Sequence, residues 1–184
     1  ISGGADAAKF TINASTGALS FVAAPNYEAP TDAGANNVYD VTVQVSDGTL
    51  TDTQAIAVTV TPVNEAPAIT SDGAGAAAAV NVAENSSAVT TVTATDPDAA
   101  TTLTYAITGG ADAAKFAINA STGALSFLAT PNYESPTDAG VNNVYDVTVQ
   151  VSDGTLTDTQ AIAVTVTPLN DNNPVITSNG GGAS

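Results

Sequence analysis

The 184-residue chain contains no cysteine, histidine, methionine or tryptophan, and it has only two basic residues. Without cysteine no disulfide bond can form, so cysteine content says nothing about the redox compartment. Without histidine or cysteine, the chain lacks the commonest general base and the most reactive nucleophile. Paired carboxylates could cleave glycosides in principle, but their near-duplication along the chain argues against it. We therefore expect no enzymatic activity.

Positive charge is almost absent. The two basic residues face 18 aspartates and glutamates, which gives a formal net charge of −16. Phosphate backbones and anionic membrane surfaces would be repelled. The longest uninterrupted apolar run, residues 76–80, is far too short to cross a bilayer. We expect an anionic segment that binds no nucleic acid and does not span a membrane.

The chain repeats itself. Residues 1–62 recur at 107–168, and 56 of these 62 positions are identical. Repetition over a domain-sized period predicts a tandem array. We expect the last part of one repeat at 1–66, a complete repeat at 67–174 and the start of a third at 175–184, all within a longer protein. The six differences are Ser2/Thr108, Thr11/Ala117, Val22/Leu128, Ala24/Thr130, Ala29/Ser135 and Ala35/Val141.

Apolar residues alternate with polar ones along several segments of the complete repeat. This period of two predicts half-buried strands. Two further short strands flank a glycine-bearing turn at 119–123. About seven strands in about a hundred residues predict an all-β fold, namely tandem seven-stranded Greek-key sandwiches of immunoglobulin-like plan. The apolar positions are Val80, Val82, Val89, Val92, Leu103, Tyr105, Ile107, Phe116, Ile118, Leu125, Phe127, Tyr145, Val147, Val149, Val151, Ile162, Val164 and Val166.

Acidic residues of the complete repeat gather where the predicted strands end. This placement favours cation ligands over a general solvating coat. Oxygen-only ligation selects a hard cation, and flexible loops with many ligands suit Ca²⁺ better than octahedral Mg²⁺. The acids at strand ends are Glu84, Asp96, Asp98, Glu134, Asp153 and Asp171.

Five short motifs follow one another in the complete repeat, and their order resembles that of a cadherin repeat of the bacterial cadherin-like type. The resemblance covers essentially the whole chain. It implies a cadherin-type sandwich with calcium bound between consecutive repeats. The motifs are Ala83-Glu84-Asn85, Asp96-Pro97-Asp98, Asn132-Tyr133-Glu134, Val151-Ser152-Asp153-Gly154 and Leu169-Asn170-Asp171-Asn172-Asn173-Pro174.

The resemblance also implies two sets of calcium ligands. Pro62 and Pro168 replace an aspartate of the family's linker motif, and Asn26 and Asn132 replace another. We therefore expect fewer or weaker ions at each junction than in animal cadherins. The first set, around residues 64–67, would be Glu28, Asn64, Glu65, Asp96, Asp98 and Asp153. A second, half-built set would be Glu84, Asn132, Glu134, Asn170, Asp171 and Asn172.

Ordinary turn chemistry is the alternative for some of these residues. Aspartate and glycine favour turns without any metal, as in Asp96-Pro97-Asp98 and Asp153-Gly154. The loop at 32–37, repeated at 138–143, could be an additional ion loop, but a solvated turn is favoured.

These patterns predict a structural role. Calcium between successive sandwiches would fix their angle and turn the array into a stiff spacer of an extracellular or surface adhesin from a bacterium. Its direct partners would be adjacent repeats. A carbohydrate-binding or homophilic adhesion module is the alternative, which ranks lower because most aromatic residues fall on inward strand positions. Strand exchange between subunits also stays open.

Overall fold

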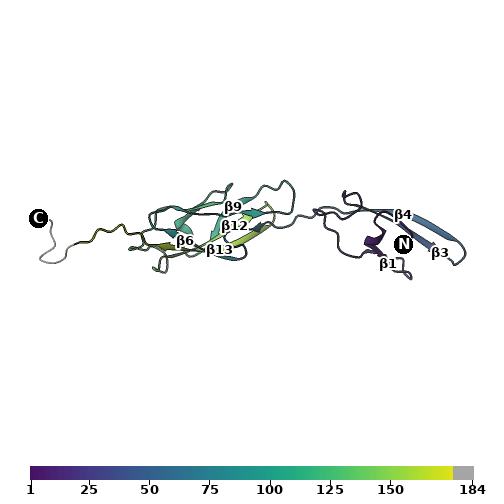
Figure 1. Ribbon diagram of the computed structural model, residues 1–184, viewed down its shortest axis with the longest axis horizontal. Coiled ribbons are helices and arrows are strands. Elements are labelled where there is room, and N and C mark those ends of the chain that lie inside the picture. Colours follow the sequence, from purple (N-terminus) through teal and green to yellow (C-terminus); the bar gives the residue numbers. More distant parts are fainter. Residues whose placement is uncertain (176–184) are drawn as a thin grey trace. The chain divides into compact units, whose positions relative to one another are not determined.

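β-strands build both parts of the structure, a computed structural model that describes residues 1–175. The chain divides into a first unit, Ile1–Glu65, and a second unit, Ala66–Ser184 (Figure 1). Among the described residues there is no α-helix, only two 3-10 turns, η1 (Ala7–Lys9) and η2 (Ala113–Lys115). Apart from Val175, the predicted start of a third repeat at 175–184 lies outside the described residues.

The second unit is a two-layer sandwich. One layer is a four-stranded sheet in the order β6-β13-β12-β9, in which β6 runs parallel to β13 and the other neighbours are antiparallel. The other layer holds β10-β11-β7 and the pair β5-β8. The strands are β5 (Ala68–Ile69), β6 (Ala77–Ala83), β7 (Ala88–Thr91), β8 (Ala94–Thr95), β9 (Thr104–Gly109), β10 (Phe116–Ile118), β11 (Ala124–Phe127), β12 (Val144–Ser152) and β13 (Thr157–Thr167).

Two strands of the sandwich are each divided between two shorter ones. β5 pairs with β8 in one layer, and the chain then crosses to the other layer as β6. Likewise β7 and β8 belong to one extended run, in which the Val92 amide donates to Gly123 and the Thr93 carbonyl accepts from Thr70. Counted as continuous runs, these are the seven strands that the sequence predicts.

Alternation along β12 and β13 builds the core. Val149 and Val151 on β12 and Val164 on β13 are fully buried. Phe116 and Phe127 stack with ring centroids 4.6 Å apart, and the edge of Tyr145 meets Phe127 at 5.1 Å. Side chains from both layers thus fill one core, as expected for a sandwich.

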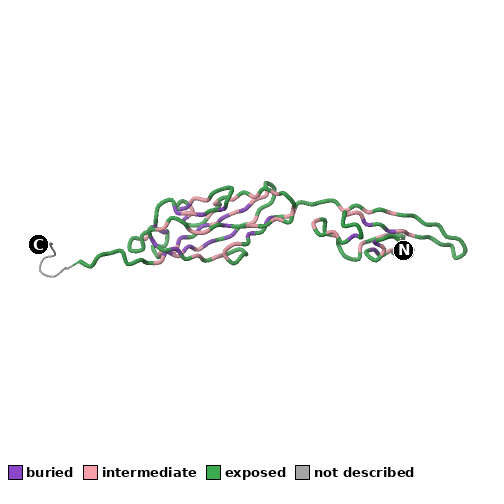
Figure 2. Tube along the Cα trace, turned by 45° about the horizontal axis from the view of Figure 1, so that its top comes forward, coloured by how far each residue is buried: buried purple, intermediate pink, exposed green. Residues whose placement is uncertain are grey.

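The first unit contains the same β-hairpins with fewer covering strands. Its register repeats that of the second unit, with Tyr39 opposite Val58 as Tyr145 is opposite Val164. Residues 1–65 contain no counterpart of the segment 68–106. Val45 is 69% exposed for this reason, whereas its counterpart Val151 is 0% exposed, and Figure 2 shows fewer buried residues in this unit. The strands are β1 (Phe10–Ile12), β2 (Leu19–Phe21), β3 (Val38–Ser46) and β4 (Thr51–Thr59).

Buried aspartates fix the loops of each repeat. Asp112 is 4% exposed and accepts the amide hydrogens of Ala139, at 2.7 Å, and Asp146, at 3.0 Å. Gly110 allows its segment to approach β12 closely, because its φ is 104° and a Cβ there would overlap the Asp146 carbonyl oxygen. The carboxylate therefore ties the 138–143 loop to β12.

The loop at 138–143 is a turn, but it is not a solvated one. Asp138 is only 3% exposed, and its two oxygens accept the amide hydrogens of Asn142 and Asn143 at 2.9 and 3.0 Å. Asp32 is 6% exposed and holds the equivalent loop of the first unit in the same way. The sequence predicted a solvated turn here, because the residue types alone do not indicate these hydrogen bonds between the aspartate and the backbone.

Asp112→Ala should lower the free energy of unfolding by about 2 to 4 kcal/mol, because two buried amides lose a charged acceptor. Urea denaturation followed by circular dichroism measures this. The exposed Asp146 on β12 provides the matched control, since Asp146→Ala should change stability by less than about 0.5 kcal/mol. Equal losses in the two variants would contradict the role given to Asp112.

Candidate metal centre

The predicted ligands of the second unit lie at its two opposite ends. β6 and β13 finish together, with Ala83 opposite Thr167, so Glu84 lies beside the linker that follows Thr167. We call this the trailing end. At the leading end, Ala68 pairs with Thr95, directly before Asp96.

The hairpin that carries Asp153 also lies at the leading end. Ser152 pairs with Thr104, and Asp158 accepts the amide hydrogen of Ile69 at 2.9 Å. Asp96, Asp98 and Asp153 therefore share one end of the sandwich, and Glu84, Glu134 and Asp171 share the other.

Glu84 is the centre of the trailing end. It is 1% exposed, and its Oε1 and Oε2 accept the amide hydrogens of Leu169 at 2.7 Å and Tyr133 at 2.8 Å. Its own amide donates to the Thr167 carbonyl at 2.9 Å. One buried carboxylate thus joins the end of β6, the 131–135 loop and the linker after β13.

Three carboxylates converge at this point. One oxygen each of Glu84, Glu134 and Asp171 lies within 4.8 Å of the others. Ca²⁺ binds oxygen at about 2.3 to 2.6 Å, so two ligands on opposite sides of one ion stand about 5 Å apart. The spacing fits a single ion, and three anions this close would otherwise repel one another.

Asn85 positions one of these carboxylates. It adopts a left-handed backbone conformation with φ of 64°, which asparagine tolerates well. Its Nδ2 donates to Asp171 Oδ2 at 2.7 Å, and its amide donates to the Pro131 carbonyl at 2.9 Å. Sequence reasoning placed Asn85 in a motif but gave it no role, although an asparagine directly after a strand is a signal for such a turn.

Hydrogen bonds keep Glu84 ionised. The backbone amides of Leu169 and Tyr133 lower the pKa of Glu84 below its ordinary value, while burial acts in the opposite direction, and a side-chain interaction with Glu134 adds to the lowering. At neutral pH the trailing end therefore presents a carboxylate held in one orientation.

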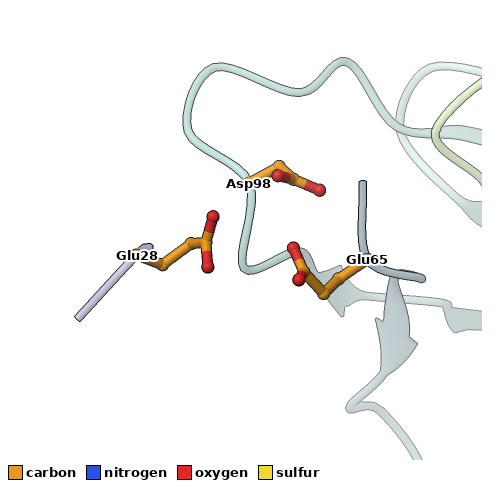
Figure 3. Close-up of side chains that lie close together, drawn as sticks. All are labelled: Glu28, Glu65 and Asp98. Atoms are coloured by element: carbon orange, nitrogen blue, oxygen red, sulfur yellow. The ribbon is translucent and has the colours of Figure 1, made fainter. Parts of the chain in front are cut away.

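The first unit repeats two of these three carboxylates. Glu28 and Glu65, the counterparts of Glu134 and Asp171, bring carboxylate oxygens within 4.8 Å of each other. Figure 3 shows these side chains, together with Asp98 from the loop after β8 of the second unit. Residues 1–65 contain no counterpart of Glu84. The pairing of a loop acid with a linker acid thus recurs in both repeats.

Asp96 and Asp153 at the leading end each contribute an oxygen to a turn. Asp96 Oδ1 accepts the amide hydrogen of Asp98 at 2.9 Å, and Asp153 Oδ1 accepts those of Thr155 and Leu156 at 2.6 Å each. Turn chemistry is therefore present here, as the alternative interpretation expected. Asp96 Oδ2 is buried and accepts no hydrogen bond from residues 1–175, which leaves that oxygen available to a cation.

The predicted amide ligands remain predictions. Asn132 Oδ1 accepts the amide hydrogen of Ser135 at 3.0 Å, so it also stabilises its own turn. Asn64 is exposed and donates to the Glu65 carbonyl at 3.2 Å. Asn170 and Asn172 are exposed in the segment after β13.

Comparison with known proteins finds a family match within the second unit. Residues 78–167 match the family model described as cadherin domain. This stretch, 90 of the 184 residues, is similar to a cadherin domain. Residues 1–62 repeat 107–168 at 56 of 62 positions, so the first unit repeats the later part of the matched stretch. Cadherin domains are extracellular and non-enzymatic, they typically bind Ca²⁺, and they pack with adjacent repeats. The expected absence of enzymatic activity is thereby confirmed.

Solved cadherin structures share the fold. Mouse cadherin-23 EC22-24 matches at 21% identity with a TM-score of 0.57, over 88% of this chain and 50% of that one. Human protocadherin-24 EC1-2 matches at 21% identity with a TM-score of 0.58, over 90% of this chain and 80% of that one. Drosophila N-cadherin EC1-4 matches at 18% identity with a TM-score of 0.60, over 85% of this chain and 39% of that one. The predicted cadherin-type sandwich is confirmed.

The chain spans half or less of the first solved structures that it matches. No curated protein matches it in sequence. Within residues 1–175 no helix is long and apolar enough to cross a membrane.

Glu84 should make stability depend on pH. Its folded pKa lies below the ordinary value of 4.5, so its contribution is present above pH 4.5 and is lost as pH falls through the folded pKa. In metal-free buffer, Glu84→Gln should therefore flatten the fall of the melting temperature below that pH. Thermal unfolding by circular dichroism measures the slope, and Asp146→Asn is the control. An unchanged slope in Glu84→Gln would contradict this account.

Proposed function

We propose that this chain is a calcium-stiffened spacer in the repeat region of a bacterial extracellular adhesin or surface filament protein. The carboxylate cluster of Glu84, Glu134 and Asp171 at the trailing end carries the proposal. Asp96, Asp98 and Asp153 at the leading end of the same sandwich complement it. A repeat with ligands at both ends can bind ions shared with both of its neighbours.

Each junction would combine the trailing ligands of one repeat with the leading ligands of the next. For the two repeats present, the ligands would be Glu28, Asn64, Glu65, Asp96, Asp98 and Asp153. For the following junction, this chain would supply Glu84, Asn132, Glu134, Asn170, Asp171 and Asn172. The recurrence of Glu28 and Glu65 as Glu134 and Asp171 supports an equivalent site after each repeat.

Charge explains why the ion would stiffen the array. Carboxylates gathered at one end of a sandwich repel one another and those of the next sandwich. A shared Ca²⁺ removes that repulsion and fixes the linker, because its ligands come from the loop, the linker and the neighbouring repeat. The spacer would hold an adhesive domain away from the cell surface.

Fewer ions per junction are expected than in animal cadherins. Pro168 occupies the position of a linker aspartate, and Asn132 that of a loop aspartate. Each replacement removes one charged ligand, so both the number of ions and their affinity should be lower.

A neutral-carbohydrate or homophilic module is less well supported. Neutral sugars are usually recognised by exposed aromatic faces, but Phe116, Phe127 and Tyr145 are at most 5% exposed. Tyr133, at 37%, is the most exposed aromatic side chain of residues 66–175. Bead aggregation with calcium would test the homophilic form.

Calcium should extend and stiffen a protein of three complete repeats. Small-angle X-ray scattering in millimolar calcium should give a larger maximum dimension than in excess chelator, because free linkers sample bent arrangements. A shortened chain of one repeat is the control and should change little. Equal maximum dimensions for three repeats in both buffers would contradict the spacer role.

Loss of the leading-end aspartates should weaken calcium binding. In a protein of two complete repeats, Asp96→Asn and Asp98→Asn should each reduce calcium affinity by about tenfold or more, because each removes a charged ligand. Isothermal titration calorimetry measures this. Asp146→Asn, which changes an exposed strand acid, should bind calcium like the parent. Parent-like affinity in the Asp96 and Asp98 variants would exclude both residues as ligands.

A further inference from the structure

Both repeats contain the same pocket. It lies between the last turn of the 3-10 segment, the loop after the second short strand and the buried tyrosine of the long hairpin. Eleven residues line it in each repeat, at equivalent positions. Its volume is about 550 Å³ in the second unit and about 330 Å³ in the first. These are volumes of small-molecule sites.

The chain places its only two basic side chains at these pockets. Lys115 lines the pocket of the second unit, and Lys9 that of the first. Both are exposed, and neither ammonium group pairs with a carboxylate of residues 1–175. None of the eleven lining positions is acidic in either repeat, although the chain has 18 acids. The lining itself therefore suits an anion, and the acid in the same loop, Glu134 or Glu28, is not part of that lining.

Hydrogen-bond donors line the same pocket as the lysine. The Oδ1 of Asn132 is engaged by the amide of Ser135, so its Nδ2 is the part of that side chain available to a ligand. The hydroxyl groups of Thr130 and Ser135 add further donors and acceptors, whereas that of Thr137 lies 3.4 Å from the Tyr145 hydroxyl and shares a hydrogen bond with it. Phe127 and Tyr145, at 4% and 1% exposed, form an apolar base and present no open ring face.

Differences between the repeats concentrate in this pocket. Three of the six substitutions, Val22/Leu128, Ala24/Thr130 and Ala29/Ser135, fall on its eleven lining positions. The other three are spread over the remaining 51 compared positions. The lysine and the buried tyrosine are the same in both. A lysine that is the same in both pockets, among rim residues that differ, is the pattern expected of two binding sites for one kind of ligand with different affinities.

We propose that each pocket binds one carboxylated sugar at the end of a glycan chain. The sugar carboxylate pairs with Lys115, or with Lys9 in the first unit. The sugar hydroxyls bond to the donors on the rim, which are fewer in the first unit because Ala24 and Ala29 take the places of Thr130 and Ser135. A single charge fits because a polyanion would be repelled by the net charge of −16. A neutral sugar would lack both the ion pair and an open aromatic face for stacking.

Asn132 is the one residue that the pocket shares with the proposed calcium ligands, and Lys115 is not among them, so sugar binding does not require the spacer proposal. The proposed sugar site adds a binding function to that of the spacer. Identical modules in tandem would engage several glycan ends at once, and weak single contacts would then add up to firm attachment.

Two-dimensional ¹H–¹⁵N NMR of the 184-residue chain tests the site with four probes. The probes are glucuronate, N-acetylneuraminate, neutral glucose, and N-acetylglutamate as a carboxylate without a sugar. One or both sugar acids should shift the amides of residues 128–137 and 22–31, and the other two probes should bind at least about tenfold more weakly. Equal binding of glucose or N-acetylglutamate would overturn the sugar-acid assignment, as would no shift with either sugar acid.

Variants separate the two pockets within one molecule. Lys115→Gln should weaken binding in the second unit by about tenfold or more and leave the first unit unchanged. The lysines are exposed, so an unperturbed spectrum without ligand verifies the fold. Unchanged binding in the double variant K9Q/K115Q would refute the role of the lysines.

The variable rim has its own test. The triple variant L128V/T130A/S135A gives the second pocket the lining of the first, and its affinity should become that of the first pocket. Affinities that are already equal in the parent chain, or that stay different in the triple variant, would refute tuning by the rim.

Discussion

The parallel pairing of β6 with β13 determines the arrangement of the trailing end. Because the two strands finish side by side, Glu84 is buried next to the linker, where it accepts hydrogen bonds from Leu169 and Tyr133. This buried carboxylate fixes the loop and the linker that carry Glu134 and Asp171. Without Glu84 these two segments would lose the two hydrogen bonds that join them, although Glu28 and Glu65 of the first unit approach within 4.8 Å without such a residue.

Aspartates have two different roles in each repeat. Asp112 and Asp138 are buried and satisfy backbone amides, so they hold the loops of the metal-free sandwich. The acids at the two ends are more exposed and repel one another, Glu84 excepted. The same negative charge therefore stabilises the interior of a repeat and, by our proposal, makes its ends depend on a cation. Tandem repetition extends this dependence along the array.

Sequence periodicity predicted β12 and β13 well, because their apolar residues alternate without interruption. It did not predict the crossing from β5 to β6, since the alanine-rich segment at 76–79 gives no contrast between its two faces. Turn residues located Asp153 correctly, but the hydrogen bonds of Glu84 join residues 49 and 85 positions away. Such long-range contacts arise from the fold, and no local pattern records them. The roles of all twelve predicted residues as calcium ligands, carboxylates and amides alike, are still predictions.

The central claim is that a cation binds among the carboxylates at the trailing end. A high-resolution crystal structure of a protein with two complete repeats, grown in millimolar calcium and measured for anomalous scattering, tests it most directly. The account predicts an anomalous peak at about 2.3 to 2.6 Å from oxygens of Glu84, Glu134 and Asp171. A well-ordered trailing end with water alone between these three residues would contradict it.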